Sequence, residues 1–392
     1  MTQASTETPT ISTDNFICPN CGGSLKHDAH KDKFLCASCG FESEIAPPAE
    51  DVKEFSFDGY AEREAASTPF TSMSTATCQT CGNQIAFEAS ETAKICPMCG
   101  STQISSTKQK AGIAPGGIIP FRVDKQDAAH KFTEWVKGLW FAPNRLKQSY
   151  QGGHLAGRFV PFWTFDADVM ATYTGQGGRY RKVKDSEGNE RTETDWYPTG
   201  GIVQTSYDDE LICACKDAST RLDMEQVGPF DTINELRPFA PEYIAGYSAE
   251  LYSVKADAAF DDLKGRKQSD LVSLASADIN RRFDTSRNVH VNAMYTNVTY
   301  KHVLLPVWTS IFSYNNKGYR YVVNGATGKV HGERPYSAIK IIAAIAVALG
   351  VLFGGFALFS GGEEMPEEAA AAGIATVSVQ LEPLAASSTP QL

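Results

Sequence analysis

Four Cys-x-x-Cys pairs constrain this sequence more than any other feature. Eight of its ten cysteines fall into two modules that each read C-x2-C-x14-C-x2-C, and the second module repeats the first at an offset of 60 residues. A glycine follows every pair. The eight cysteines are Cys18, Cys21, Cys36 and Cys39 in the first module and Cys78, Cys81, Cys96 and Cys99 in the second. This spacing is typical of metal ligands rather than of the disulfide framework of a secreted protein.

Two such pairs, brought together by a hairpin, complete a tetrahedral four-thiolate site with no open position, which is a structural site rather than a catalytic one. The sequence therefore predicts two structural Zn²⁺ ions, one in each module. Iron in a rubredoxin-like site is the competing interpretation. His27 and His30 are alternative ligands in the first module, but four cysteines already fill the site, so we expect both to be exposed loop residues. Modules this small fold only with their metal.

The other two cysteines, Cys213 and Cys215, alternate in a strand-like stretch and would face the same side of a sheet. Their expected Cα separation is near the upper limit for a disulfide. We interpret them as small side chains that pack on one face.

The overall charge argues against a general attraction to nucleic acid. The chain of 392 residues has a net charge of −10 and a pI of about 5.3. Neither Cys module forms a basic patch, and the stretch between them is acidic, so it would repel phosphate. Contacts with protein partners are favoured, and nucleic-acid binding through the modules is the alternative.

Composition divides the chain into seven segments of a mixed α+β protein. They are a disordered tail at 1–15, a zinc ribbon at 16–41, an acidic linker at 42–75, a second zinc ribbon at 76–101, an α+β domain at 112–335, a transmembrane helix at 338–360 and an acidic disordered tail at 361–392. The first tail has no apolar segment of the secretory type. The two ribbons are expected to be small β structures.

The large domain shows signs of an internal duplication. Residues 159–164 (FVPFWT) and 304–309 (LLPVWT) share one pattern, and Asp-Ala-Ala occurs upstream of each, at 127–129 and 257–259. The spacing of apolar residues predicts a helix near 124–140 with Asp124 as its N-cap. Asn-Gly between strand-forming residues predicts a hairpin around 320–331. The alternative is that the two Pro-Trp motifs are unrelated edge strands.

Residues 341–359 contain no charge and, as a helix, would span about 28 Å, which matches a bilayer core of about 30 Å. Lys and Arg precede this run, and Glu follows it. Charge bias then predicts a single-pass protein of the bacterial inner membrane, with cytoplasmic N-terminal domains and the C-terminal tail outside. Gly350 and Gly354 form a GxxxG pattern through which two helices, and so a homo-oligomer, could associate.

No catalytic constellation is recognisable. The sequence lacks the phosphate-binding loop of nucleotide-dependent motors, the nucleophile elbow of hydrolases and the zinc-protease motif. The remaining histidines are scattered without ligand or triad spacing. We therefore expect a protein that is not an enzyme, while a site assembled from distant residues of 112–335 is a further alternative.

The Cys-Pro-x-Cys-Gly knuckles at 18–22 and 96–100, the PFWT strand at 161–164 and the NGATGK hairpin at 324–329 together resemble a family of bacterial zinc-ribbon membrane proteins. Its members are labelled transcription-factor-IIB-type zinc ribbon or primosomal-protein-N′-like, and the resemblance covers about 16–360. It implies a membrane-anchored protein that works with membrane-stress factors, of the phage-shock kind or flotillin-like. It does not imply helicase activity, because the motor motifs are missing.

These observations favour a membrane-anchored cytoplasmic adaptor or scaffold whose zinc ribbons recruit protein partners. A membrane-tethered nucleic-acid-binding protein is the second hypothesis. The predicted contacts with the bilayer run through 338–360.

Overall fold

The structure is a computed structural model. It describes residues 17–45, 51–67, 73–79, 84–88, 104–107, 112–144, 155–184, 186, 188–314 and 317–359. The predicted tails at 1–15 and 361–392 lie outside these residues. The chain forms two compact units, 1–335 and 336–392.

The first unit is a mixed α+β structure, as expected. Its helices are α1 (Tyr60–Ala65), α2 (Lys125–Gly138), α4 (Ala218–Val227) and α5 (Ala256–Asn280), with short 3-10 turns η2 (Phe57–Gly59) and η3 (Pro241–Ile244). Its strands are β1 (Leu25–Asp28), β2 (Lys33–Cys36), β3 (Glu42–Glu44), β4 (Phe55–Ser56), β5 (Met73–Cys78), β6 (Gln84–Glu88), β7 (Ile104–Thr107), β8 (Gly117–Ile118), β9 (Ala156–Lys184), β10 (Glu190–Cys213), β11 (Arg237–Pro238), β12 (Ser248–Glu250), β13 (Thr285–Tyr314), β14 (Lys317–Asn324) and β15 (Val330–Gly332).

Two sheets are present among the described residues. The small sheet has the order β1-β2-β3 and belongs to the first Cys module. The large sheet runs β11-β8-β13-β9-β12-β6-β5-β7, with β10 on β9 and β14 on β13. The stretch at 42–75, predicted as an acidic linker, thus contributes β3 to the small sheet and β4 to the large one.

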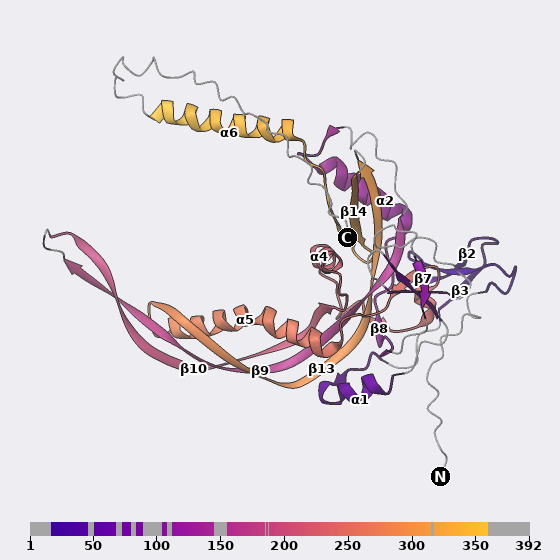
Figure 1. Cartoon of the computed structure of the whole chain (residues 1–392), viewed down its shortest axis with the longest axis horizontal. Helices are drawn as coiled ribbons and strands as arrows, with labels where there is room; N and C mark the ends of the chain where they lie inside the picture. Colours follow the sequence, from indigo (N-terminus) through magenta and orange to yellow (C-terminus); the bar gives the residue numbers. More distant parts are fainter. Residues whose placement is uncertain are drawn as a thin grey trace, which may run out of the picture. The chain divides into compact units, whose positions relative to one another are not determined.

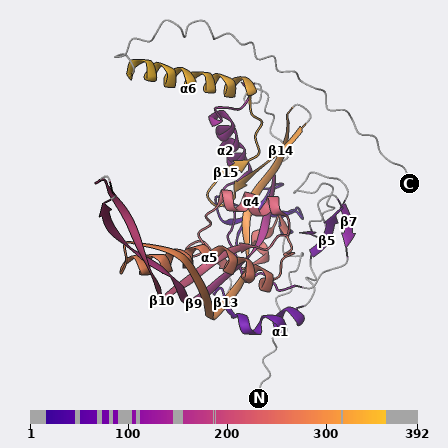
Figure 2. The ribbon, with the colours of Figure 1, turned by 60° about the vertical axis from the view of Figure 1, so that its left-hand side comes forward.

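Strands β9, β10 and β13 form a long curved arm, and α5 lies along one face of it (Figure 1, Figure 2). Alternate residues of β9, Val169, Ala171 and Tyr173, are buried against Leu271, Ala275 and Ile279 of the helix. This alternation is the period of a strand with one covered face. β13 begins opposite Gly178, so β9 and β10 continue beyond it as a two-stranded hairpin.

The two Pro-Trp motifs pair with each other across the centre of the large sheet. β9 and β13 are antiparallel, and Val160 lies opposite Leu305, its own counterpart in the repeated motif. The pairing is therefore symmetric about this point, and an approximate two-fold axis passes through it. We call β8, α2, β9 and β10 the first half and β12, α5, β13 and β14 the second half.

The flanking strands obey the same symmetry. β8 runs parallel to β13 at Val303 and Leu304, and β12 runs parallel to β9 at Arg158 and Phe159, the counterpart positions. In the order β11-β8-β13-β9-β12-β6, the central pair β13 and β9 has a short parallel strand on each side, β8 or β12. Each of these is followed by an antiparallel strand, β11 or β6. In this relation each residue of 117–123 corresponds to the residue 131 positions later in the chain.

Hydrogen bonds of the tryptophans confirm the correspondence. Trp308 Nε1 donates to the Val123 carbonyl at 2.8 Å, just before α2. Trp163 Nε1 donates to the Val254 carbonyl at 2.9 Å, just before α5. Each tryptophan thus holds the start of the helix from the other half. Buried indole N–H groups need such a partner.

Backbone bonds repeat in the same way. The Gly325 carbonyl accepts from the N–H groups of Arg122 and Val123, both at 2.9 Å. The Ala214 carbonyl accepts from those of Ser253 and Val254, at 2.8 and 2.9 Å. The hairpin that contains Gly325 is the predicted one, because β14 and β15 pair antiparallel around it. The predicted N-cap is also confirmed, since the Asp124 side chain accepts from the Asp127 N–H.

The second unit contains the helix α6 (Ala338–Phe359). The prediction of a transmembrane helix at 338–360, and with it of a single-pass inner-membrane protein of fixed orientation, is wrong. Within the part of the chain that the structure describes, no helix is both long and apolar enough to cross a membrane.

Candidate metal centre

The first Cys module is built from two matched turns. The N–H of Gly22 donates to the Cys18 carbonyl and that of Gly40 to the Cys36 carbonyl, both at 2.9 Å. Both glycines have φ near +74°, at 73° and 74°, in the left-handed region that favours glycine. The glycine after each pair is therefore required by the turn. β1, β2 and β3 hold the two turns against each other.

The four sulfurs of this module lie in the geometry of a four-thiolate site. Cys18 Sγ and Cys39 Sγ are 3.6 Å apart, and so are Cys21 Sγ and Cys36 Sγ. All four sulfurs lie within 4.8 Å of one another. A tetrahedron with Zn–S bonds of about 2.3 Å has S···S edges of about 3.8 Å. The cluster can hold a metal ion, and its size fits Zn²⁺.

Backbone N–H groups that donate to the sulfurs favour the negatively charged thiolate form of two of these cysteines. The N–H groups of Cys39 and Ser38 donate to the Cys36 sulfur and lower its pKa to about 6. The N–H of Phe41 likewise lowers the pKa of Cys39. The Gly23 N–H also lowers the pKa of Cys21, but the neighbouring thiols outweigh it and raise that pKa to about 12. Four sulfurs so close compete for charge, and a bound divalent cation removes this competition.

The second Cys module is described only in part. Cys78 ends β5 and is buried, whereas Cys81, Cys96 and Cys99 lie outside the described residues. β5 pairs with both β6 and β7, and β6 pairs with β12 of the second half through Ala249 and Glu250. This module is therefore joined to the large sheet by backbone hydrogen bonds.

The first Cys module is held to the α+β domain at the segment after β11. Ala245, next to η3, is fully buried among Cys18, Leu25, Phe34 and Cys36 of the module. The His27 N–H donates to the Ala245 carbonyl at 3.2 Å. The first Cys module and the domain thus share a hydrophobic core.

A polar chain reinforces this contact. Asp32 accepts from His27 Nε2 at 3.0 Å and from Arg237 Nη1. Arg237 also donates to the Tyr243 hydroxyl at 3.3 Å. Burial lowers the pKa of His27, so the imidazole is neutral near pH 7. The expectation that His27 is an exposed loop residue is wrong, because its side chain is fully buried in this contact.

His30 is exposed, as expected, and lies 3.2 Å from Asp124 and 3.4 Å from Asp127 at the start of α2. These three residues form a second cluster of possible ligands. All three are at least partly exposed, and one carboxylate already caps the helix. The cluster is a contact between the first Cys module and α2.

A third group of possible ligands consists of acidic residues that already pair with a lysine side chain. Glu54, Asp166 and Asp209 converge, but the Lys301 ammonium lies 2.9 Å from Glu54 and 2.6 Å from Asp209. Hydrogen bonds from Asp209 N–H and Thr299 outweigh burial and lower the pKa of Asp166. This ion-pair cluster fastens the segment around β4 to β13.

The remaining cysteines behave as predicted from their alternation. Cys213 and Cys215 are both buried in one apolar cluster with Val160, Val303 and Val322. A hydrogen bond with Cys213 and burial raise the pKa of the Cys215 thiol well above its ordinary value. The Cys215 thiol therefore stays protonated in the core.

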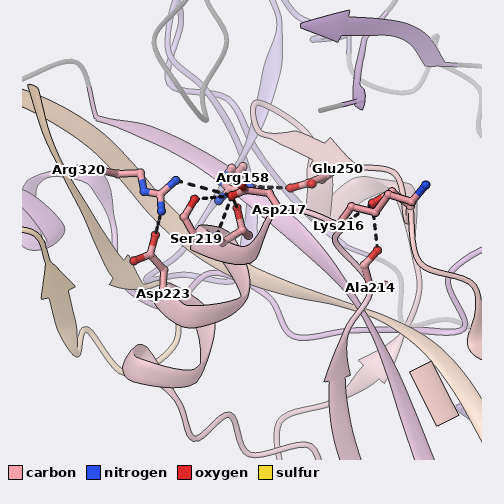
Figure 3. A network of polar contacts seen from close by, with 10 residues as sticks. Arg158, Ala214, Lys216, Asp217, Ser219, Asp223, Glu250 and Arg320 are labelled. Carbon is pink, nitrogen blue, oxygen red and sulfur yellow. Dashed lines mark hydrogen bonds and ion pairs between the residues drawn. The ribbon is translucent and has the colours of Figure 1, made fainter. Parts of the chain in front are cut away.

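Next to Cys215 lies a buried polar network that the sequence did not indicate (Figure 3). Arg158 Nη1 donates to Glu250 at 2.6 Å, and both side chains are 3% exposed. Burial raises the pKa of Glu250, although the attraction of Arg158 opposes this. Arg320 pairs with Asp223 at 2.7 Å beside it. No motif marks these residues, since they come from four separate elements.

Comparison with known proteins adds one relative. The chain is 28% identical over 334 residues to the uncharacterized protein YdjG of Bacillus subtilis (strain 168), which covers 84% of this chain and 92% of that protein. No protein-family model matches the chain. No solved structure matches it either.

Proposed function

We propose that this protein is a non-enzymatic, zinc-binding adaptor that recruits protein partners. The observation that supports this most is the closed four-cysteine cluster of the first Cys module, which is held firmly against an α+β domain. Four thiolates leave no coordination position for a substrate, so a metal there stabilises structure. The net charge of −10 favours a protein partner over a nucleic acid.

The same proposal includes zinc as the metal and two ribbons in the chain. The S···S distances and the lowered pKa values of Cys36 and Cys39 support a four-thiolate Zn²⁺ site in the first module. The identical spacing of the second module supports a second site. The symmetric pairing of β9 with β13 supports an origin of the large domain by internal duplication.

Metal analysis of the full-length protein tests the first part. We expect two Zn²⁺ per chain, and one after the double substitution Cys18→Ser plus Cys21→Ser. The control is Cys213→Ala plus Cys215→Ala, which removes two cysteines outside the clusters and should keep both ions. Iron in place of zinc, or no bound metal, would contradict the proposal.

Affinity capture from cells tests the second part. The full-length protein should retain specific protein partners that the Cys18→Ser plus Cys21→Ser variant loses, while the Cys213→Ala plus Cys215→Ala control keeps them. If the wild-type protein captures no partner above background, the adaptor function is refuted. Tight, salt-dependent binding of DNA or RNA by the wild-type protein would favour the nucleic-acid alternative instead.

A further inference from the structure

Strand β10 is the outermost strand of the arm that it forms with β9 and β13 (Figure 1, Figure 2). It pairs with β9 along 190–213, and no strand in the described part of the chain pairs with its other side. In an antiparallel ladder, alternate residues of the outermost strand direct their N–H and C=O groups away from the neighbouring strand. The outer edge of β10 therefore offers a row of backbone donors and acceptors to a further strand.

One stretch of this edge lacks the features that usually prevent pairing. Natural edge strands are blocked by charged side chains, proline or bulges. Between Pro198 and the change of register that follows Tyr207, residues 199–207 (TGGIVQTSY) contain none of these. Their side chains alternate, since Ile202 is 59% exposed and Val203 packs toward α5. The stretch is thus a regular strand that is open on one side.

The opposite edge of the arm, on β13, is less regular. Its register with β9 changes twice, at 287–290 and at 296–299. Asn288 and Asn297, inside these two interruptions, each have a φ of 52°. Such bulges bend a strand and increase its twist, which opposes pairing with another strand. The uninterrupted stretch between them, 290–296, is also shorter than 199–207, so the better pairing edge is that of β10.

Residues 199–207 are complementary to a second copy of themselves in antiparallel order. When Val203 of one copy faces Val203 of the other, Ile202 lies opposite Gln204. Pro198 then lies opposite Asp208, so the regular stretch ends at the same place in both copies. Like charges directly opposite each other destabilise a strand pair, and this register contains none. A self-complementary contact of this kind closes with two subunits.

We propose that two copies of this protein associate through the outer edges of their β10 strands, over 199–207 and in antiparallel order. Main-chain hydrogen bonds then join the two arms into one sheet with the order β13-β9-β10-β10-β9-β13. The two-fold axis is perpendicular to this sheet, so α5 of each copy lies on the same face. The association requires neither the metal sites nor the adaptor function.

Sedimentation equilibrium of the full-length, zinc-loaded protein tests the association. We expect a reversible monomer–dimer equilibrium. Ile202→Lys plus Gln204→Lys places lysines of the two copies opposite one another and should raise the dissociation constant about tenfold or more. The matched control is Asn292→Lys plus Met294→Lys on the β13 edge, because both pairs lie beside 170–172 of β9. It should keep the dissociation constant within about twofold.

Hydrogen exchange of the wild type identifies the backbone that becomes covered. In concentrated protein, about half of the amides in 199–207 should exchange more slowly than in dilute protein, because alternate N–H groups gain a bond. The amides of 290–296 should exchange alike at both concentrations. The Ile202→Lys plus Gln204→Lys variant should show no dependence on concentration in either stretch.

The proposal is overturned if the wild type stays monomeric up to about 100 μM. It is also overturned if protection in the dimer lies outside 199–207, or if Ile202→Lys plus Gln204→Lys dimerises as tightly as the wild type. All four substituted side chains are exposed, so we expect each variant to fold. Zinc content and unfolding temperature, compared with the wild type, check this.

Discussion

The two halves of the large domain share the same strand pairing, but they differ at one pair of equivalent positions. An ion pair is buried beside the start of α5, and apolar side chains are buried beside the start of α2. In the strand before α5, Glu250 of β12 pairs with Arg158 of β9, and both are buried (Figure 3). The counterpart residues are Ile119 and Val303, which lie in one apolar cluster. The strand pairing and tryptophan bonds are alike in both places. The fold therefore needs the space between these two strands to be filled by side chains, but it does not need those side chains to be charged.

Breaking the ion pair on one side should have the largest effect. Arg158→Ala leaves Glu250 buried without its cation, and such a loss costs about 3–5 kcal/mol of unfolding free energy. The double variant Arg158→Val plus Glu250→Ile copies the other half and keeps a similar total volume. It should lie within about 1 kcal/mol of the wild type in urea unfolding. A double variant as unstable as Arg158→Ala would show that the two places are not equivalent.

A second difference between the halves concerns His302, whose counterpart is Gly157. His302 is buried beside Trp163 and Tyr252, and burial lowers its pKa to about 4. The unfolded state, with a pKa near 6.5, binds a proton first as the pH falls. Stability should therefore be complete above pH 6.5 and decrease below it, by about 2 kcal/mol at pH 5.

Urea unfolding at pH 7.5 and at pH 5 measures this contribution. The wild type should lose about 2 kcal/mol more than His302→Gln over this interval, because glutamine does not titrate. The matched control is His130→Gln on the exposed face of α2, which should follow the wild type. Parallel losses in all three proteins would disprove the role of His302.

The smallest expected difference lies at the two helix starts. Asp124 caps α2, whereas Lys255 stands at the same place before α5 and makes no side-chain cap. Asp124→Ala should cost about 1 kcal/mol, and Asp124→Asn much less. Lys255→Asp should add up to about 1 kcal/mol by capping α5. Thermal unfolding of the three variants measures the effect, and a loss of stability in Lys255→Asp would show that its ammonium matters more than the cap.

Local patterns carried most of what the sequence could predict. The turns around Cys18 and Cys36 depend on a few neighbouring residues and a glycine, so spacing alone located the cluster of four cysteines. The helix cap at Asp124 and the Asn324 hairpin are local in the same sense. The repeated Pro-Trp motif also indicated the two related strands.

Contacts between distant segments could not be predicted from such local sequence patterns. His27 is buried because Arg237 and Tyr243 meet its module, and these residues lie some two hundred positions further along. The cavity of about 420 Å³ beside Lys216 is lined by residues of four segments, which lie at Glu64, Gly112, Lys216 and 251–258. The membrane prediction rested on the uncharged run at 341–359, its length as a helix and the charges on either side, and the finding for α6 overturned it. No short motif encodes any of these arrangements.

The central pairing of Val160 with Leu305 also dictates an order of events during synthesis. These partners are 145 residues apart, so the middle of the large sheet cannot close until most of the chain has left the ribosome. The first Cys module pairs its strands within residues 25–44, so it can fold far earlier. Until Ala245 emerges, the face of that module that later becomes buried is open to solvent and to chaperones.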